Sequence, residues 1–176
     1  MKYYLSADAF QRDCMRLARK VFDDPAWQPD LLLALWRGGA QPGVIMSEVF
    51  AFLGRAVPHT VVQCASYAGI GERTSEVIFQ NADELFNSIT PGTRVLVIDD
   101  VFDSGKTAEA VKQRLTQVDV RIATVYWKPH AKLVDFMPDY VVRELNEWIV
   151  FPHELDGLTP DELRHKDPEL AEILLG

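Results

Sequence analysis

The stretch "VLVIDDVFDSGKTAEAV", residues 95–111, decides the fold class of this chain. Its first four residues, 95–98, are apolar without alternation, which indicates a strand that is buried on both faces of a parallel sheet. Asp99 and Asp100 follow directly, and a helix is expected over about 107–118. Open α/β sheets bind their ligands at the carboxyl ends of such strands. We therefore expect the acidic turn between strand and helix to form a binding loop.

Strand and helix signals alternate on both sides of this stretch, which predicts an α/β fold with a mainly parallel sheet and right-handed crossovers. A Ser cap and apolar residues at helical spacing predict the first helix, and Gly54 closes the second. The predicted helices cover about 7–22 and 44–54, and the predicted strands cover 31–35, 57–66, 76–80, 121–128 and 139–144.

Length and composition limit the class of protein. A chain of 176 residues is long enough for one domain with a sizeable core and too short for two domains that each have such a core. The formal charge of −8 argues against duplex nucleic acid as a partner, because phosphate binding depends on clustered Lys and Arg. The chain start lacks an apolar signal core, and no stretch approaches the ~20 apolar residues that cross a bilayer. We therefore expect no membrane association. Cys14 and Cys64 form no close metal-type pair, so we expect reduced thiols, which suit a cytoplasmic location.

The Gly-Lys-Thr run suggests a P-loop, and this alternative fails on spacing and on charge. A Walker motif needs another glycine five residues before Gly105, and Asp100 stands there. The two adjacent carboxylates would also occupy the place where a nucleotide's phosphates have to lie. We therefore reject the P-loop.

The turn instead has the composition of a binding loop for one phosphate. Hydroxyl groups, a glycine that lets the backbone approach and the amides at a helix N-terminus favour an anion. The residues of this loop are Asp103, Ser104, Gly105, Lys106 and Thr107. The two acids upstream are suited to accept hydrogen bonds from vicinal hydroxyls or to organise Mg²⁺. A sugar phosphate satisfies both halves of the loop.

The run "VLVIDDVFDSGKT" resembles the phosphoribosyl diphosphate (PRPP) binding motif of the type I phosphoribosyltransferases. The resemblance extends over about residues 30–154. It implies an α/β fold whose central, mostly parallel sheet is flanked by helices on both faces, with a small hood built from the two chain ends. We expect a phosphoribosyltransferase domain over residues 1–154, hood included, and an acidic C-terminal appendage over residues 155–176.

Two further loops resemble those of the family. "LWRGG" is similar to its diphosphate loop, which assigns Arg37, Gly38 and Gly39 to PRPP and implies a non-proline cis peptide bond before Arg37. Arg-Gly-Gly is also an ordinary turn.

"SYAGIGERTSEV" resembles the flexible catalytic loop that folds over the diphosphate and excludes water. The resemblance gives Tyr67 and Arg73 catalytic roles and assigns Ser66 to PRPP. A mobile polar hairpin loop is the alternative interpretation.

The stretch "YWKPHAKLVDFMPDYVVRELNEWIVFPHE" resembles the base-recognition region of the purine branch, the hypoxanthine and xanthine-guanine phosphoribosyltransferases. By that likeness Lys128 addresses the 6-oxo group, Trp148 stacks on the ring, and the Ile149 carbonyl meets the 2-position. Glu154, together with the two acids of the PRPP motif, is assigned to Mg²⁺, and Asp103 moves the proton of N7. Taken singly, these residues also fit ordinary roles as a core aromatic, a strand end or a surface acid. Their order after the acidic loop favours the site.

The resemblance implies a Mg²⁺-dependent transfer of 5-phosphoribosyl from PRPP to a 6-oxopurine, either hypoxanthine or guanine, with xanthine as a further candidate. The products are the nucleoside 5′-monophosphate and diphosphate, as in nucleotide salvage, and the expected assembly is a homodimer or homotetramer. One alternative is a phosphoribosyltransferase for another nucleobase. A second is a regulator that binds PRPP or a nucleotide without turnover. The retention of Asp103, Lys128 and Trp148, without an added basic RNA-binding segment, favours the enzyme.

Overall fold

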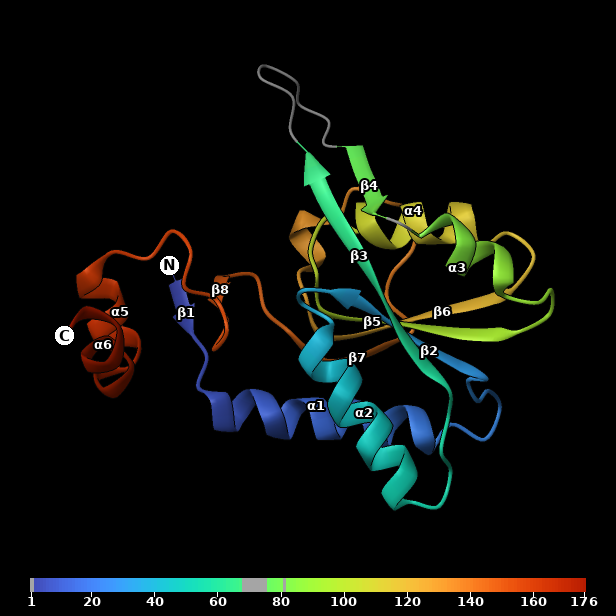
Figure 1. The fold of residues 1–176 in the computed structure, drawn as a ribbon, viewed down its shortest axis with the longest axis horizontal. Helices are drawn as coiled ribbons and strands as arrows, with labels where there is room; N and C mark the ends of the chain where they lie inside the picture. Colours follow the sequence, from blue (N-terminus) through green and yellow to red (C-terminus); the bar gives the residue numbers. More distant parts are fainter. Residues whose placement is uncertain (1, 68–75, 81) are drawn as a thin grey trace. The chain divides into compact units, whose positions relative to one another are not determined.

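A computed structural model describes residues 2–67, 76–80 and 82–176 of the chain (Figure 1). The chain divides into two compact units. The sheet unit is Gln11–Asn146, and the terminal unit combines Met1–Phe10 with Glu147–Gly176.

The sheet unit is built on a six-stranded sheet with the strand order β4-β3-β2-β5-β6-β7. All neighbouring strands are parallel except β3 and β4, which form an antiparallel pair. The strands are β2 (Leu31–Trp36), β3 (His59–Tyr67), β4 (Glu76–Gln80), β5 (Arg94–Phe102), β6 (Asp119–Trp127) and β7 (Tyr140–Glu144). The prediction of a mainly parallel sheet is confirmed.

Strand β5 is the centre of this sheet, with β2 on one side and β6 on the other. Its residues 95–98 have no exposed surface, as the apolar run predicts. The strand continues further than the sequence indicates, because its pairing with β6 extends from Arg94↔Asp119 to Phe102↔Trp127. Asp99 and Asp100 therefore lie within strand β5 and not in the loop that follows it.

Helices cover both faces of the sheet, as predicted. Helices α1 (Ala7–Phe22) and α2 (Ala40–Phe52) lie on one face, and α3 (Asp83–Ser88) and α4 (Lys106–Arg114) lie on the other (Figure 1). Helix α1 buries a stripe at helical spacing that consists of Cys14, Leu17, Ala18 and Val21. Helix α2 begins four residues earlier than predicted, directly after Gly39. Helix α4 ends four residues earlier than predicted, where the chain turns to start β6.

A buried carboxylate on α1 joins this helix to two strands. Asp13 has no exposed surface, and it accepts hydrogen bonds from the Tyr126 hydroxyl on β6 (2.9 Å) and from the Arg143 guanidinium on β7 (3.1 Å). Arg16, one turn along the helix, forms an ion pair with it at 2.5 Å. Buried charges are tolerated when they are paired and hydrogen-bonded in this way.

We expect Asp13→Ala to lower the free energy of unfolding by about 3 kcal/mol, because it removes charge-assisted hydrogen bonds from the protein interior. Urea denaturation followed by circular dichroism measures this. Asp23→Ala is the matched control, since Asp23 pairs with Arg19 at the exposed end of the same helix, and exposed pairs contribute at most about 1 kcal/mol. Equal losses in the two variants would contradict the structural role of Asp13.

Both chain ends form the terminal unit, as the prediction of a hood from the two ends requires. Strand β1 (Lys2–Tyr4) pairs in parallel with β8 (Trp148–Val150), and the Phe10 ring lies edge-on to Phe151 at 5.4 Å. The acidic tail forms α5 (Pro160–Lys166) and α6 (Pro168–Leu175). A capping box between Thr159 and Glu162 starts α5. That residues 155–176 form an appendage separate from residues 1–154 stays a prediction.

No helix within the described residues is long and apolar enough to span a membrane. The cytoplasmic location stays a prediction. The thiols of Cys14 and Cys64 are free, and burial raises their pKa values to about 12 and about 11. Both thiols are therefore protonated at neutral pH and are poor nucleophiles.

Candidate active site

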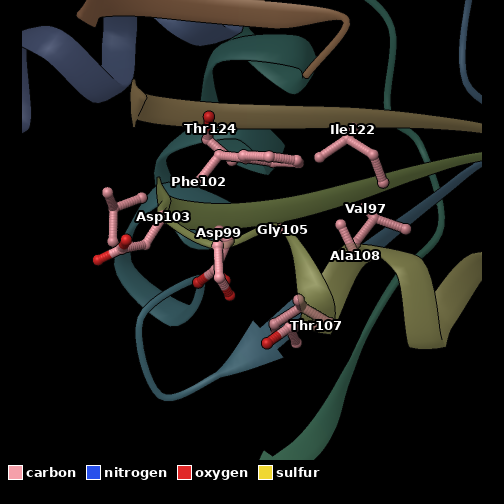
Figure 2. Close-up of a pocket in the computed structure, with 12 residues that line it drawn as sticks. Val97, Asp99, Phe102, Asp103, Gly105, Thr107, Ala108, Ile122 and Thr124 are labelled. Atoms are coloured by element: carbon pink, nitrogen blue, oxygen red, sulfur yellow. The ribbon is translucent and has the colours of Figure 1, made fainter. Parts of the chain in front are cut away.

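A pocket lies where β5 ends and α4 begins, and its lining combines the predicted phosphate loop with one of the two acids. Asp99, Asp103, Ser104, Gly105 and Thr107 all line it (Figure 2). The neighbouring parallel strands bring further residues to the same place, because the carboxyl ends of parallel strands share one edge of the sheet. The structure thus brings together five of the residues that the PRPP motif assigns.

Gly105 is required by the shape of this loop. Its φ is +82°, a left-handed conformation that side-chain-bearing residues rarely adopt. A Cβ atom at this position would also lie 2.5 Å from a methyl group of Val134 and 2.6 Å from the Phe102 ring. The tight turn places the first amides of α4 directly after the loop, and the Ser104 hydroxyl accepts from the Lys106 amide at 3.4 Å. Amides and hydroxyls in this arrangement can hold an anion.

The two acids of β5 have different surroundings. Asp99 lines the pocket, whereas the Asp100 carboxylate lies against Gly38, where a Cβ atom would approach its oxygen to 2.5 Å. The pKa of Asp99 is raised well above its ordinary value, first by burial and then by the negative charge of Asp100. A cation or hydroxyl donors would relieve this repulsion.

The acids fit the way in which Mg²⁺ is held beside phosphates. Mg²⁺ is usually bound by one or two carboxylates together with substrate phosphates and water. Within residues 2–67, 76–80 and 82–176, no three His, Cys, Asp or Glu side chains gather into a metal site of their own. Asp99 and Asp100 would therefore share the ion with oxygen atoms of the substrate and of water.

The predicted diphosphate loop packs on the end of β5. The Trp36–Arg37 peptide bond is cis, as the resemblance implies. Gly39 has no room for a side chain, because a Cβ atom would collide with the Ile98 carbonyl oxygen. The loop backbone therefore lies directly against the strand that carries the acids.

Lys128 follows β6 and reaches the phosphate loop. Its ammonium nitrogen donates to the Asp103 carboxylate at 2.7 Å, and the lysine side chain is 11% exposed while that of Asp103 is 48% exposed. The backbone amide of Lys128 donates to the Phe102 carbonyl at 2.9 Å. Two residues with separate predicted roles in base recognition thus form a direct ion pair at the pocket.

The remaining predicted base and metal residues belong to the terminal unit. Trp148 is 60% exposed, Ile149 is buried in the β1–β8 pair, and the Glu154 carboxylate accepts from the Phe151 amide at 3.3 Å. Their assignments to the base and to Mg²⁺ stay predictions.

The predicted catalytic loop lies largely outside the described residues. Ser66 and Tyr67 are the last residues of β3, where their backbones pair with β4. Their side chains and the whole of Arg73 are not described. The roles of all three residues stay predictions.

Thr124 on β6 was not anticipated from the sequence. It is the register partner of Asp99 and lines the same pocket. It is 1% exposed, and its hydroxyl has no hydrogen-bond partner among the described residues. A polar residue within the apolar run "IATVYW" is the signal that could have indicated it.

The family and structural comparisons agree with this geometry. Residues 2–157 match the model of the phosphoribosyl transferase domain family. A purine phosphoribosyltransferase from Pyrococcus horikoshii is 28% identical, with a TM-score of 0.69 over 90% of this chain and 97% of the other. A Neisseria gonorrhoeae protein that was solved with bound ppGpp is 27% identical, with a TM-score of 0.72 over 98% of this chain and 97% of the other. The xanthine-guanine-hypoxanthine phosphoribosyltransferase of Helicobacter pylori shares the fold at 20% identity, with a TM-score of 0.67 over 89% of this chain and 96% of the other.

Paired acids near the end of a central strand, a turn that contains hydroxyls and a glycine, and the start of a helix form an arrangement that suits a sugar phosphate. The chain belongs to the phosphoribosyl transferase domain family.

Proposed function

We propose that the protein is a purine phosphoribosyltransferase that moves 5-phosphoribosyl from PRPP to a 6-oxopurine. The observation that carries this proposal is the ion pair between Lys128 and Asp103 at the phosphate loop. It offers a hydrogen-bond donor beside an acceptor. Along one edge of hypoxanthine or guanine, the 6-oxo acceptor lies beside the N7–H donor, so the two patterns are complementary.

The phosphate loop supports the other half of the proposal. The hydroxyls and amides of residues 104–107 would hold the 5′-phosphate, and Asp99 and Asp100 would accept hydrogen bonds from the ribose hydroxyls. Mg²⁺, when bound by these acids and the substrate, supplies positive charge to the leaving diphosphate.

The transfer breaks one bond, forms one bond and moves one proton. The C1′–oxygen bond of PRPP breaks, and its electron pair leaves with the diphosphate. The base nitrogen N9 forms the new bond to C1′, and the N7 proton passes to Asp103. The diphosphate loop at Arg37 would hold the leaving group in place during this step.

A second candidate is a regulator that binds a nucleotide without transfer. The Neisseria relative favours it, since that protein was solved with bound ppGpp. One experiment separates the two. The protein is incubated with PRPP, Mg²⁺ and each free base in turn, and any monophosphate is identified by mass spectrometry. A nucleoside 5′-monophosphate from a 6-oxopurine supports the enzyme, and a product from pyrimidines alone would replace the substrate class. PRPP binding without any product would favour the regulator.

We expect the double replacement of Asp99 and Asp100 by Ala to weaken PRPP binding strongly. Each lost charge-assisted hydrogen bond is worth about 1.5–3 kcal/mol, which corresponds to at least tenfold in affinity per acid. Thermal stability should stay constant or rise, because the repulsion between the two carboxylates is removed. Titration calorimetry with PRPP measures the affinity. An unchanged dissociation constant would remove both acids from the site.

The homodimer or homotetramer stays a prediction. Sedimentation velocity on the full chain measures the mass of the assembly.

A further inference from the structure

The segment that starts at Lys128 contacts the phosphate loop and the elements on both sides of it. This segment, residues 128–136, contains a short 3₁₀ turn at Pro129–Ala131. Two backbone hydrogen bonds fasten it to the end of β5 and to the loop. The Lys128 amide donates to the Phe102 carbonyl, and the Leu133 amide donates to the Ser104 carbonyl, both at 2.9 Å.

Side chains complete the attachment. Val134 is 6% exposed, and its methyl group occupies the space beside Gly105 where a side chain of the loop would otherwise lie. The Phe136 ring packs edge-on against Phe102 at 5.7 Å. The Lys112 ammonium of α4 lies 4.5 Å from the centre of the Phe136 ring. The segment therefore contacts the strand before the loop, the loop itself and the helix after it.

We infer that Val134 is a positioning residue that fixes the phosphate loop relative to Lys128. Gly105 has a left-handed backbone and no side chain that could hold it in place. Glycine can also adopt backbone conformations that other residues avoid, so the loop needs support from its neighbours. The Val134 methyl group fills the adjoining space and blocks movement of the loop in that direction. The same segment starts with Lys128, so one packed unit sets both the phosphate end and the base end of the site. This inference rests on the proposed function for the identity of the ligands.

A purely structural role makes a different prediction. Val134 belongs to the hydrophobic core between the sheet and α4, together with Val95, which has no exposed surface. If Val134 only filled this core, its truncation would lower stability as truncation of Val95 does, and ligand binding would be unaffected. Val95 lies near the opposite end of β5 from the loop, so Val95→Ala is the matched control.

The experiment compares Val134→Ala, Val134→Ile and Val95→Ala by calorimetric titration with ribose 5-phosphate, which contains the phosphate and the ribose hydroxyls but no base. Small displacements of binding groups have large effects, so we expect Val134→Ala to weaken binding about tenfold. Val134→Ile, which keeps the branched Cβ, should restore most of the affinity, and Val95→Ala should stay within about threefold of the wild type. Hydrogen exchange of the amides of residues 104–107 should accelerate only in Val134→Ala.

Two failures are distinguishable. If the wild type does not bind ribose 5-phosphate, the phosphate loop is misassigned, and the proposed function fails together with the inference. If the wild type binds but Val134→Ala and Val95→Ala behave alike in affinity and exchange, the positioning role of Val134 is overturned while the proposed function stands.

Discussion

Asp103→Asn should fold normally and lose most of its transfer activity. Asp103 lies beyond the end of β5 with half of its side chain exposed, so the amide can be accommodated without a change in the core. An amide cannot take the N7 proton, and general acid-base groups contribute typically ~10²–10⁴-fold to the rate. It also removes the anion that pairs with Lys128. We therefore expect kcat to fall by about that factor at every pH.

Steady-state kinetics with hypoxanthine and PRPP provide the measurement, with circular dichroism to verify folding. Asp135→Asn is the matched control, because Asp135 is an exposed acid on the segment that follows Lys128, and it should retain kcat within about twofold. Near-full kcat in Asp103→Asn would remove this carboxylate from the reaction.

Much of this site could be predicted from the sequence because its parts are local. The apolar run 95–98, the acids and the Ser-Gly-Lys-Thr turn are contiguous, and contiguous residues report backbone geometry directly. Gly105 is an example. Its left-handed φ and its contact with Val134 both require glycine, and the motif has glycine there.

Features that depend on pairing between distant segments could not be predicted in the same way. The extension of β5 through Asp99 and Asp100 follows from its ladder with β6, which no local pattern records. Strands β1 and β8 have three residues each, which is too short to show the alternating pattern of a strand. They also pair with each other across most of the chain, which no local pattern indicates. Helix α3 has six residues and was likewise missed.

The different surroundings of the two acids are also a tertiary effect. The motif treats Asp99 and Asp100 as equivalent, but adjacent residues of a strand point to opposite faces. Asp99 consequently lines the pocket, while Asp100 packs against the Gly38 backbone. The two carboxylates therefore have different neighbours, one facing the pocket and the other beside the backbone of the predicted diphosphate loop.

The Lys128–Asp103 ion pair carries the prediction with the largest effect, a strong preference for 6-oxopurines over adenine. Lys128 has three donors and no acceptor, so its ammonium can serve a 6-oxo oxygen, whereas the 6-amino group of adenine offers it only another donor. The lysine side chain is only 11% exposed, so water does not readily replace the missing acceptor. Sites built around such a hydrogen bond can reject the wrong analogue by ~10⁴ or more.

Measurement of kcat/KM for adenine, hypoxanthine, guanine and xanthine tests this preference. We expect hypoxanthine and guanine to exceed adenine by about 10⁴-fold. Among the 2-substituted bases we expect guanine to exceed xanthine, because the carbonyl assigned at Ile149 accepts from a 2-amino group and repels a 2-oxo group. Adenine that equals hypoxanthine would overturn the role of Lys128.

A pair of variants assigns the preference to one side chain. Lys128→Met removes the ammonium and keeps much of the apolar stem, so the ratio of kcat/KM between hypoxanthine and adenine should fall towards one. Lys132→Met changes another lysine of the same segment and should leave the ratio near its wild-type value. The preference depends on a difference between two bases within one variant, so a general loss of stability or of PRPP affinity cancels from the ratio. A collapse of the ratio in Lys128→Met alone therefore identifies the group that reads the 6-position, and an equal collapse in both variants would place that reading outside this ion pair.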